Sequence, residues 1–416
     1  MKIQIPYGKS QLIADIPGYD VDFIVPKNHE AVAKPLAVVR NAIENPIGAI
    51  TPPQAGQRVS IAVNDKTRPV PHEDLLPPLL DWLQDCGIRH EHILFVIATG
   101  THPVMPPEEY TWILPKSIVE GYRIICHDAY DDSTLAHIGR TSRATPVFIN
   151  RDYMQADYHI VVGNIEPHQF MGFSGGVKSA AIGVAGKATI NHNHAMMTDE
   201  YAKLGEYEAN PARQDVEEIG RMMRIDFALN AILNGKKQIV RTLAGNPVEV
   251  MKVAIPQVRS IYQVPVNAPF DLLIVSPGGY PKDINMYQAQ KALAHAALVM
   301  KDGGTVILCA ACPEGTGSQS YETWITDTRM SDHQAVLERF KQEGFHIGPH
   351  KAYQISRDAT RLHVLLISDM PTDFVRKLLL HPLPDLQAAI DIALRDLPDN
   401  PHIGVMPLAN STIPML

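Results

Sequence analysis

The sequence predicts an α/β protein of two domains with mostly parallel, doubly wound sheets. Its 416 residues exceed the size of one ordinary domain. Short apolar runs recur along the chain, and amphipathic patterns with helical spacing separate them. Strands that are apolar throughout are typical of parallel sheets that helices cover on both faces.

The expected elements follow this pattern in order. Apolar strands are expected at residues 59–63, 93–97, 122–126, 158–162, 272–275, 305–309 and 364–367, and helices at 73–85 and 286–300. The stretch VPVNAPF at 264–270 has two prolines before a new strand, which marks a domain boundary. We therefore expect an N-terminal α/β domain at 1–265 and a C-terminal α/β domain at 266–399. The proline-rich segment 400–416 is a candidate to fold back onto the first domain.

The composition indicates which classes of partner to expect and in which compartment the protein works. A formal net charge of −8 argues against a protein that binds nucleic acid by bulk electrostatics. The first residues, MKIQIPYGKSQL, lack the apolar core of a signal peptide, and no apolar run approaches the ~18 residues of a membrane helix. Four cysteines suit a reducing compartment, and the lone CxxC at Cys309 and Cys312 favours a buried strand end over a metal site. We expect a cytoplasmic protein without a membrane partner.

Glycine, charged and imidazole groups follow four of the expected strands. In open α/β sheets, ligands bind beyond the carboxyl ends of the strands, where such loops meet. We therefore expect a shared site, or else ordinary polar turns. The loops lie at 64–69, 98–102, 163–179 and 277–281.

Individual residues in these loops suit particular chemistry. Arg68 suits planar recognition of a carboxylate or phosphate, or else forms a surface ion pair. Asp65 suits a ribose hydroxyl, or else caps a turn. His102 and His168 lie on different loops, and two histidines on opposite sides of one carbon suit a racemase or epimerase. Their alternative is a hydrogen bond to the backbone.

The stretch HQFMGFSGGVKSAAIG looks like a mis-spaced phosphate-binding loop. A P-loop requires glycine directly before its lysine, whereas Val177 separates Gly176 from Lys178 here. Its glycines would let a nucleotide lie close to the backbone. The function of Lys178 therefore needs another explanation.

Two further groups of residues are candidates for binding. His192 and His194 form an HxH, which suits zinc or a single metal ligand. With His168 they allow a rival interpretation as a zinc-dependent hydrolase. A second rival is a noncatalytic relative that only binds a cofactor. Tyr287, Gln288 and Lys291 share one face of the helix at 286–300 and suit a substrate carboxylate, or else form a solvated face.

Four motifs resemble those of the nickel-pincer-nucleotide-dependent lactate racemase family. They occur in the family's order and at about its spacing, and they span almost the whole chain. The motifs are DKTRPVP at 65–71, ATGTH at 98–102, the stretch from His168 through Lys178 to Asn193-His194, and GGYP at 278–281 continuing to YQAQK at 287–291.

The resemblance implies a two-domain α/β enzyme that racemises or epimerises a 2-hydroxy acid in a cleft between the domains. The implied cofactor is the nickel-pincer nucleotide, pyridinium-3,5-bisthiocarboxylic acid mononucleotide nickel, attached covalently to Lys178. The implied mechanism is proton-coupled hydride transfer through a 2-keto acid. Separate enzymes build this cofactor, so cofactor-biosynthesis proteins are implied partners.

The resemblance also implies a role for each matching residue. His102 and His168 match the acid/base pair, and His194 matches the nickel ligand. The implied cofactor-binding residues beside Lys178 are Asp65, Thr67, Gly172, Ser174, Gly175 and Gly176. The implied substrate-binding residues are Arg68, Tyr287, Gln288 and Lys291.

Three departures from the family's pattern concern the substrate. The familiar lactate racemases have arginine where Val177 stands, and Arg-Pro where Pro103-Val104 stands. Near 348–356 they carry a tryptophan in the substrate pocket, where this chain has His350 or Lys351. These departures argue against lactate and favour a larger or more polar 2-hydroxy acid, such as a dicarboxylate or a sugar acid.

Overall fold

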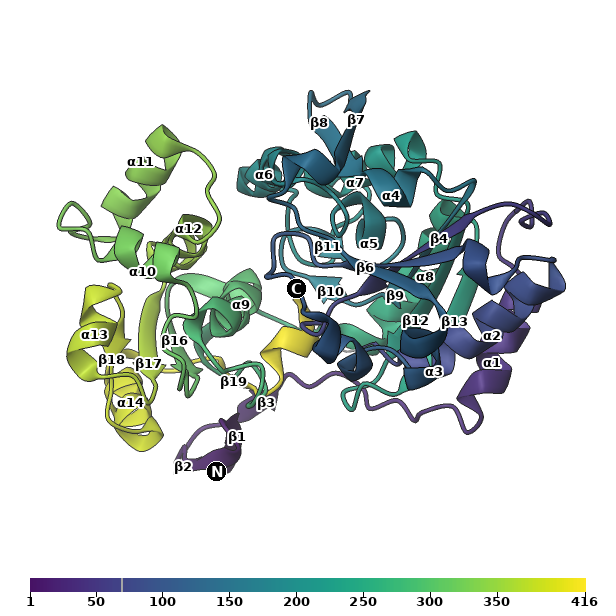
Figure 1. The fold of residues 1–416 in the computed structure, drawn as a ribbon. Coiled ribbons are helices and arrows are strands. Elements are labelled where there is room, and N and C mark those ends of the chain that lie inside the picture. Colours follow the sequence, from purple (N-terminus) through teal and green to yellow (C-terminus); the bar gives the residue numbers. More distant parts are fainter. Residues whose placement is uncertain (69) are drawn as a thin grey trace. The chain divides into compact units, whose positions relative to one another are not determined.

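In a computed structural model, the chain is described at residues 1–68 and 70–416 and divides into two compact units. The N-terminal unit comprises residues 28–261, and the C-terminal unit comprises residues 1–27 together with 262–416. Figure 1 shows the helices and strands of both units, with most of them labelled. Pro69, which belongs to the first motif, lies outside the described residues.

The division of the chain differs from the expected one at both ends. Residues 1–27 belong to the C-terminal unit, because β3 (Val21–Phe23) pairs in parallel with β19 (Ile403–Met406). β19 also pairs with β15 (Phe270–Val275), so the segment 400–416 lies in the C-terminal unit and not in the N-terminal one. Pairing between strands so distant in sequence leaves no trace in a local pattern.

A six-stranded sheet forms the centre of the N-terminal unit, in the order β13-β12-β9-β4-β5-β6. Neighbouring strands are parallel except for the antiparallel pair β12 and β13. The strands are β4 (Val59–Asn64), β5 (Ile93–Ala98), β6 (Arg123–Cys126), β9 (Tyr158–Asn164), β12 (Phe227–Leu233) and β13 (Ile239–Gly245).

Helices cover both faces of this sheet, as its apolar strands predict. Val59 and Ile61 of β4 share a core with Leu75 and Leu79 of α2. The intervening residues of β4 point to the opposite face, where α4 and α5 contact this strand. The helices are α1 (Pro35–Glu44), α2 (His72–Asp85), α3 (Lys116–Gly121), α4 (Arg151–Met154), α5 (Lys178–Ala181), α6 (Lys187–Ala195), α7 (Pro211–Met222) and α8 (Pro247–Tyr262).

Two short antiparallel hairpins extend the N-terminal unit. β7 (Leu135–Arg140) pairs with β8 (Pro146–Asn150). β10 (Pro167–His168) pairs with β11 (Gly172–Phe173), which places His168 opposite Gly172. The 3₁₀ helices of this unit are η1 (His90–His92), η2 (Pro107–Trp112), η3 (Asp132–Thr134) and η4 (Met196–Thr198).

The C-terminal unit has its own six-stranded parallel sheet, in the order β18-β17-β16-β15-β19-β3. Its further strands are β16 (Met300–Cys309), β17 (His363–Ile367) and β18 (His381–Pro382), with the small pairs β1 (Lys2–Tyr7) and β2 (Ser10–Asp15), and β14 (Gln263–Pro265) and β20 (Ile413–Met415). Its helices are α9 (Met286–Ala296), α10 (Gln319–Ile325), α11 (His333–Glu343), α12 (Pro349–Ala359), α13 (Thr372–Lys377), α14 (Leu386–Ala393), η5 (Ala297–Val299), η6 (Leu394–Asp396) and η7 (Ala409–Ser411).

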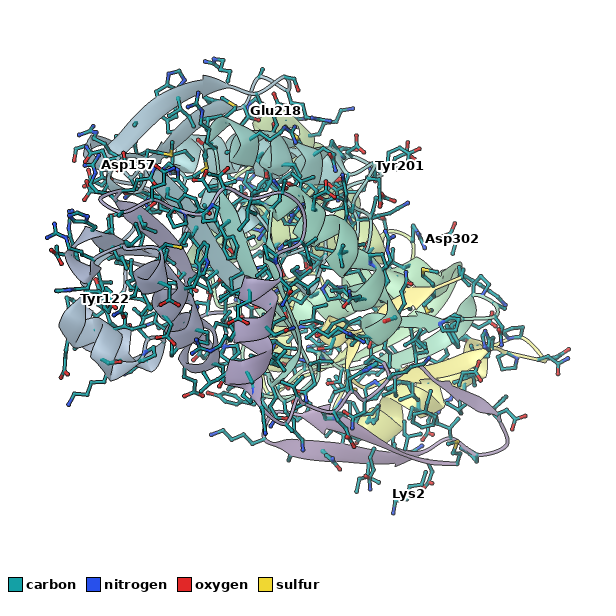
Figure 2. The ribbon with its side chains drawn as sticks, turned by 90° about the vertical axis from the view of Figure 1, so that its right-hand side faces the viewer. Lys2, Tyr122, Asp157, Tyr201, Glu218 and Asp302 are labelled. Carbon is teal, nitrogen blue, oxygen red and sulfur yellow. The ribbon has the colours of Figure 1, made fainter. Side chains whose placement is uncertain are left out.

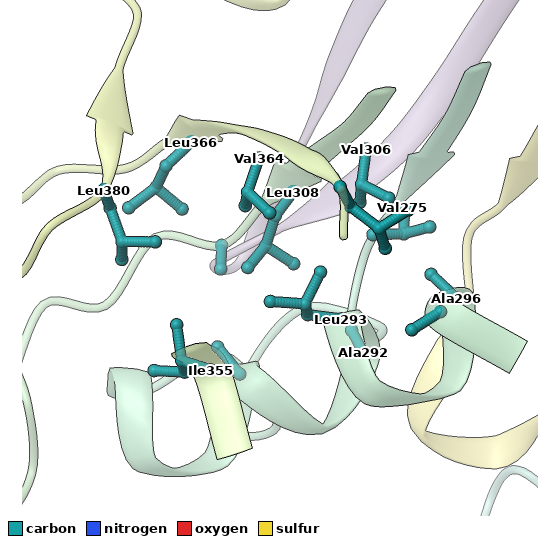
Figure 3. Close-up of a cluster of buried hydrophobic side chains, with 14 of the residues drawn as sticks. Val275, Ala292, Leu293, Ala296, Val306, Leu308, Ile355, Val364, Leu366 and Leu380 are labelled. Carbon is teal, nitrogen blue, oxygen red and sulfur yellow. The ribbon is translucent and has the colours of Figure 1, made fainter. Parts of the chain in front are cut away.

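Two cores hold the C-terminal sheet, one on each face. On one face, Val306 and Leu308 of the sheet pack against Leu293 of α9 and Ile355 of α12 (Figure 3). The opposite face packs on β1, β2 and α14. Residues of this second core include Ile3, Ile5, Ile274, Ile307 and Ile390. Helix α9, which carries three of the predicted substrate-binding residues, is therefore fixed on a buried sheet.

Polar side chains lie on the outside of both units. Lys2, Asp157 and Asp302 are exposed, and Figure 2 shows their side chains extending from the ribbon. Across residues 1–68 and 70–416, no helix has the length and apolar character needed to cross a bilayer.

Candidate active site

A pocket lies at the carboxyl edge of the N-terminal sheet, where β4, β5 and β9 end. Parallel pairing sets Asn64 beside Ala98, so the loops that follow these strands meet. The pocket has a volume of about 120 Å³, and α5 and α6 supply part of its wall. The predicted site residues that line it are Asp65, Arg68, His102, His168, Ser174, Gly175, Lys178 and His194.

Asp65 holds His102 in a defined orientation. Its Oδ2 lies 2.7 Å from Nδ1 of His102, and the Asp65 side chain is only 3% exposed. Burial acts to raise the pKa of Asp65, but the hydrogen bonds and charges of His102, Thr67 and Arg68 hold that pKa below its ordinary value. An ionised carboxylate only accepts hydrogen bonds, so Nδ1 of His102 carries the proton. Nε2 of a neutral His102 is then the basic atom.

The structure supplies protein partners for Asp65 and Thr67. Oδ1 of Asp65 accepts from the Thr67 backbone N–H at 3.0 Å and from its hydroxyl at 2.7 Å. Oγ1 of Thr67 also lies 3.2 Å from Nδ1 of His102. Both residues therefore support His102. Contact of either residue with a bound nucleotide stays a prediction.

His168 has the opposite hydrogen-bond pattern. Its Nδ1 accepts from the backbone N–H of Met171 at 3.2 Å. A neutral His168 therefore carries its proton on Nε2. In their neutral forms, Nε2 of His102 can therefore accept a proton and Nε2 of His168 can donate one.

Phe170 packs against two of the histidines. Its ring meets that of His168 edge to face, with centroids 4.9 Å apart, and that of His194 in the same way at 5.0 Å. Contacts of this kind restrict the rotation of both imidazoles. His194 reaches the pocket from α6, and Lys178 reaches it from the start of α5.

The glycines before Lys178 pack closely against other parts of the protein, and their contact with a nucleotide stays a prediction. Gly172 and Gly175 have φ angles of 69° and 76°, which side chains disfavour. A Cβ on Gly172 would lie 1.6 Å from the carbonyl oxygen of Glu206, and one on Gly175 would lie 2.4 Å from Cγ1 of Ile165. These glycines therefore allow close packing against the protein itself. Gly175 lines the pocket, whereas the lining described does not include Gly172 or Gly176.

A buried ion pair holds this loop from behind. Arg213 of α7 is fully buried and donates to the carbonyl oxygens of Phe173 at 2.9 Å and Gly175 at 3.1 Å. Its guanidinium also pairs with Glu217 at 2.6 Å. The planar fork of arginine allows all these bonds at once. The backbone before Lys178 is therefore fixed by a helix that supplies no residue to the described lining of the pocket.

The two histidines of the HxH have different surroundings. His194 lines the pocket, whereas Nε2 of His192 lies 3.1 Å from the carbonyl oxygen of Arg143. Within residues 1–68 and 70–416, no group of three or more His, Cys, Asp and Glu side chains is placed to hold a metal ion. The zinc set expected from His168, His192 and His194 is therefore not assembled in this part of the chain.

The predicted substrate residues of the C-terminal unit lie together on α9. Nζ of Lys291 donates to Oε1 of Gln288 at 2.7 Å. Nζ of Lys351, from α12, lies 4.5 Å from the centre of the Tyr287 ring, and the His350 ring lies 5.7 Å from it. We call these five residues the α9–α12 cluster. Lys351 is only 3% exposed, and its Nζ donates to Oε1 of Gln354 at 3.0 Å.

Sequence reasoning missed several residues of the site. Asn64 and Asn164 end β4 and β9 and line the pocket, and Ser179 follows Lys178 there. The position of an amide at the end of an apolar strand is a usable signal for the first two. Arg213 and Glu217 are spaced i, i+4 on α7, but this pattern is usually a solvated surface pair.

The comparisons with known sequences agree over nearly the full chain. The lactate racemase N-terminal domain family matches residues 7–205, and the lactate racemase C-terminal domain family matches residues 266–413. A lactate racemase from Thermoanaerobacterium thermosaccharolyticum is 30% identical over 424 aligned residues, covering 99% of this chain and 98% of that protein. A lactate racemase from Lactiplantibacillus plantarum is 31% identical over 327 residues, which is 77% of each chain.

The comparisons with solved structures agree as well. The lactate racemase apoprotein from Thermoanaerobacterium thermosaccharolyticum matches with a TM-score of 0.91 at 29% identity, and the match covers 100% of both chains. A protein from Thermotoga maritima matches with a TM-score of 0.68 at 18% identity over 94% of this chain and 99% of that one, which shows the fold alone. With both domains matched and identity extending over almost the whole length, the chain belongs to the lactate racemase family.

Proposed function

We propose that the chain racemises or epimerises a 2-hydroxy acid with a nickel-pincer nucleotide bound in the pocket of the N-terminal unit. Its family membership makes the chain an isomerase that acts on hydroxy acids. The observation that carries the finer proposal is the convergence of four side chains on one pocket: His102, His168, Lys178 and His194.

The residues of the pocket fit such a cofactor. The Lys178 amine is a nucleophile that would hold the nucleotide covalently as a thioamide. The single imidazole of His194 suits Ni(II) when a bound group supplies the other donors. Arg68 suits the phosphate or a carboxylate. Oδ1 of Asn64 is buried without a hydrogen-bond partner among the described residues, which favours a ligand group beside it.

The two catalytic histidines would handle the proton of the substrate hydroxyl. When bound, the cofactor supplies a temporary acceptor for the hydride on C2. Nε2 of His102 takes the hydroxyl proton, and Asp65 stabilises the imidazolium that results. Nε2–H of His168 donates to the substrate oxygen on the other side. Arg68 holds the carboxylate, so that rotation of the planar keto acid exposes its second face.

We propose a substrate more polar than lactate. Val177 is 3% exposed and packs on Gly220, where an added Cβ would lie 2.5 Å from Cβ of Val177. It thus lies in the core and brings no cation to the pocket. The segment at 348–356, where the family's lactate enzymes carry tryptophan, here has His350 and Lys351, and both side chains are buried. A basic or polar side chain in place of tryptophan suits a second anionic group on the substrate, as in a dicarboxylate. Racemisation rates on a panel of 2-hydroxy acids test this substrate proposal, and lactate as the best substrate would contradict it.

The cofactor proposal is tested by intact mass and nickel content of protein co-produced with the cofactor-building enzymes. We expect a nucleotide-sized adduct and about one nickel per chain, as a single site requires. Lys178→Ala should lose the adduct. His194→Ala should lose nickel, whereas His192→Ala, the matched control, should retain it. An unmodified wild-type mass without nickel would contradict the proposal.

A further inference from the structure

We infer that Asn193 and Asp215 fix the tautomer of His194, so that its Nε2 atom carries the lone pair that metal binding requires. Both would be positioning residues, because they act through His194. The inference rests on the proposed function, in which His194 is the nickel ligand.

The orientation of the Asn193 side-chain amide follows from its partners. Asn193 is fully buried, and its Nδ2 donates to the carbonyl oxygen of Ala212 at 2.8 Å and to Oδ2 of Asp215 at 2.9 Å. A carbonyl oxygen and a carboxylate oxygen only accept hydrogen bonds. The reversed amide would set its own oxygen against both of these acceptors. The amide nitrogen therefore faces Ala212 and Asp215.

This orientation determines which nitrogen of His194 carries the proton. Oδ1 of Asn193 lies 3.1 Å from Nδ1 of His194. Because an amide oxygen only accepts, Nδ1 must donate. A neutral His194 then has its lone pair on Nε2. Partners of this kind commonly orient histidine ligands and set their tautomer.

The side chain of Asp215 is itself held by further hydrogen bonds. It is fully buried, and its carboxylate accepts from the hydroxyls of Thr141 at 2.6 Å and Thr145 at 2.9 Å. With Nδ2 of Asn193, three donors therefore converge on this group. In all three contacts the carboxylate is the acceptor, which agrees with the donor role of the Asn193 amide nitrogen. The turn between β7 and β8 thereby contributes to the orientation of a side chain on α6.

The first test is the tautomer of His194 in the wild-type, full-length apoprotein. Two-bond ¹H–¹⁵N correlation spectra distinguish the two tautomers in protein labelled with ¹⁵N-histidine. They are recorded at a pH well above the ordinary histidine pKa of about 6.5, and His194→Gln identifies the signal. We expect a protonated Nδ1 and an unprotonated Nε2. A proton on Nε2 in the wild type would overturn the inference.

Variants then test the cause. Asn193→Leu removes the acceptor for Nδ1–H, so the Nε2–H tautomer should appear, and the holoenzyme should lose nickel to a chelator about 10–100-fold faster. Asn191→Leu changes the same residue type on the same helix without this bond and should leave both readouts unchanged. An unchanged tautomer in folded Asn193→Leu would overturn the inference.

A paired exchange covers the case in which Asn193→Leu fails to fold. Asn193→Asp combined with Asp215→Asn conserves the total charge and keeps an acceptor toward Nδ1 of His194. We expect the wild-type tautomer in this double variant, and loss of that tautomer would count against the inference. Wild-type protein without nickel after co-production would instead overturn the proposed function, since the apoprotein spectrum does not depend on nickel.

Discussion

At the scale of single residues, the backbone and buried polar groups decide what each pocket histidine can do. The Nδ1 atoms of His102, His168 and His194 face a carboxylate, a backbone N–H and an amide oxygen. Their Nε2 atoms are accordingly a base, a donor and a metal ligand in the scheme proposed above. Three identical side chains acquire three chemical characters because each has a different neighbour.

The neighbour of His102 gives a prediction for turnover. Asp65→Asn keeps the size of the side chain but weakens the acceptor for Nδ1–H and adds an amide donor beside it. We expect racemisation to fall by roughly 10²–10⁴-fold, with a smaller change in KM, because the loss concerns proton transfer. Initial rates on cofactor-loaded protein measure this. Wild-type turnover in the variant would show that Asp65 does not support the base.

The lowered pKa of Asp65 also predicts how stability depends on pH. The pKa in the folded state lies below the unfolded value, so ionised Asp65 stabilises the fold above an ordinary carboxyl pKa of about 4. This stabilisation disappears as pH falls through the folded-state pKa. The difference in urea midpoint between wild type and Asp65→Asn should therefore be largest near neutrality and shrink toward about pH 3. A constant difference across this range would contradict the assignment.

Sequence patterns supplied the positions of the site residues but not these pairings. The motifs placed His102, His168, Lys178 and His194, and all four line one pocket. The bond between His102 and Asp65 depends on how two loops meet, whereas those of His168 and His194 depend on the local conformation of a hairpin and of helix α6. Periodicity and spacing carry no information on such contacts, so the tautomers could not be read from the sequence.

At the scale of elements, the strands were the most predictable part of the chain. Each strand expected from an apolar run is present, including β4, β5, β9 and β15, because such a run is suited to a sheet that is covered on both faces. The short pair β10 and β11 was not predicted, since two-residue strands have no periodicity. That hairpin nevertheless positions His168.

Helix α7 gives a prediction at the same scale, through its buried ion pair. Arg213→Met leaves Glu217 buried without its cation and releases two carbonyl oxygens of the lysine loop. Breaking one side of such a pair costs about 3–5 kcal/mol of unfolding free energy. Urea denaturation should show this loss. Adding Glu217→Leu should recover part of it, and additive losses in the double variant would contradict coupling between the two residues.

At the scale of the whole molecule, the C-terminal unit is built from two separate pieces of chain. Residues 1–27 add the edge strand β3 and the β1–β2 pair to a sheet formed mainly by residues 262–416. Ile3, Ile5 and Ile16 are at most 1% exposed. Their burial contributes roughly 5–9 kcal/mol in total, which is comparable to the net stability of a domain.

This arrangement predicts the behaviour of fragments. Residues 28–261 produced alone should unfold cooperatively, because their sheet and cores are continuous in sequence. Residues 262–416 alone should aggregate or unfold, whereas joining residues 1–27 to them through a flexible linker should restore a cooperative transition. Circular dichroism melts of the three fragments decide this. A stable fold for 262–416 alone would show that the first 27 residues are dispensable.

During synthesis, β3 cannot pair with β19 until residues 403–406 have been made. This strand leaves the ribosome long before its partner exists, because the chain from Phe23 to Ile403 must be made first. At about 5–20 residues per second, that interval is roughly 20–75 s. The apolar side chains of β1 remain without their final neighbours during this delay, while residues 28–261 have time to fold completely. A chaperone would therefore encounter a chain in which residues 28–261 are folded while residues 1–27 still lack their partner strand.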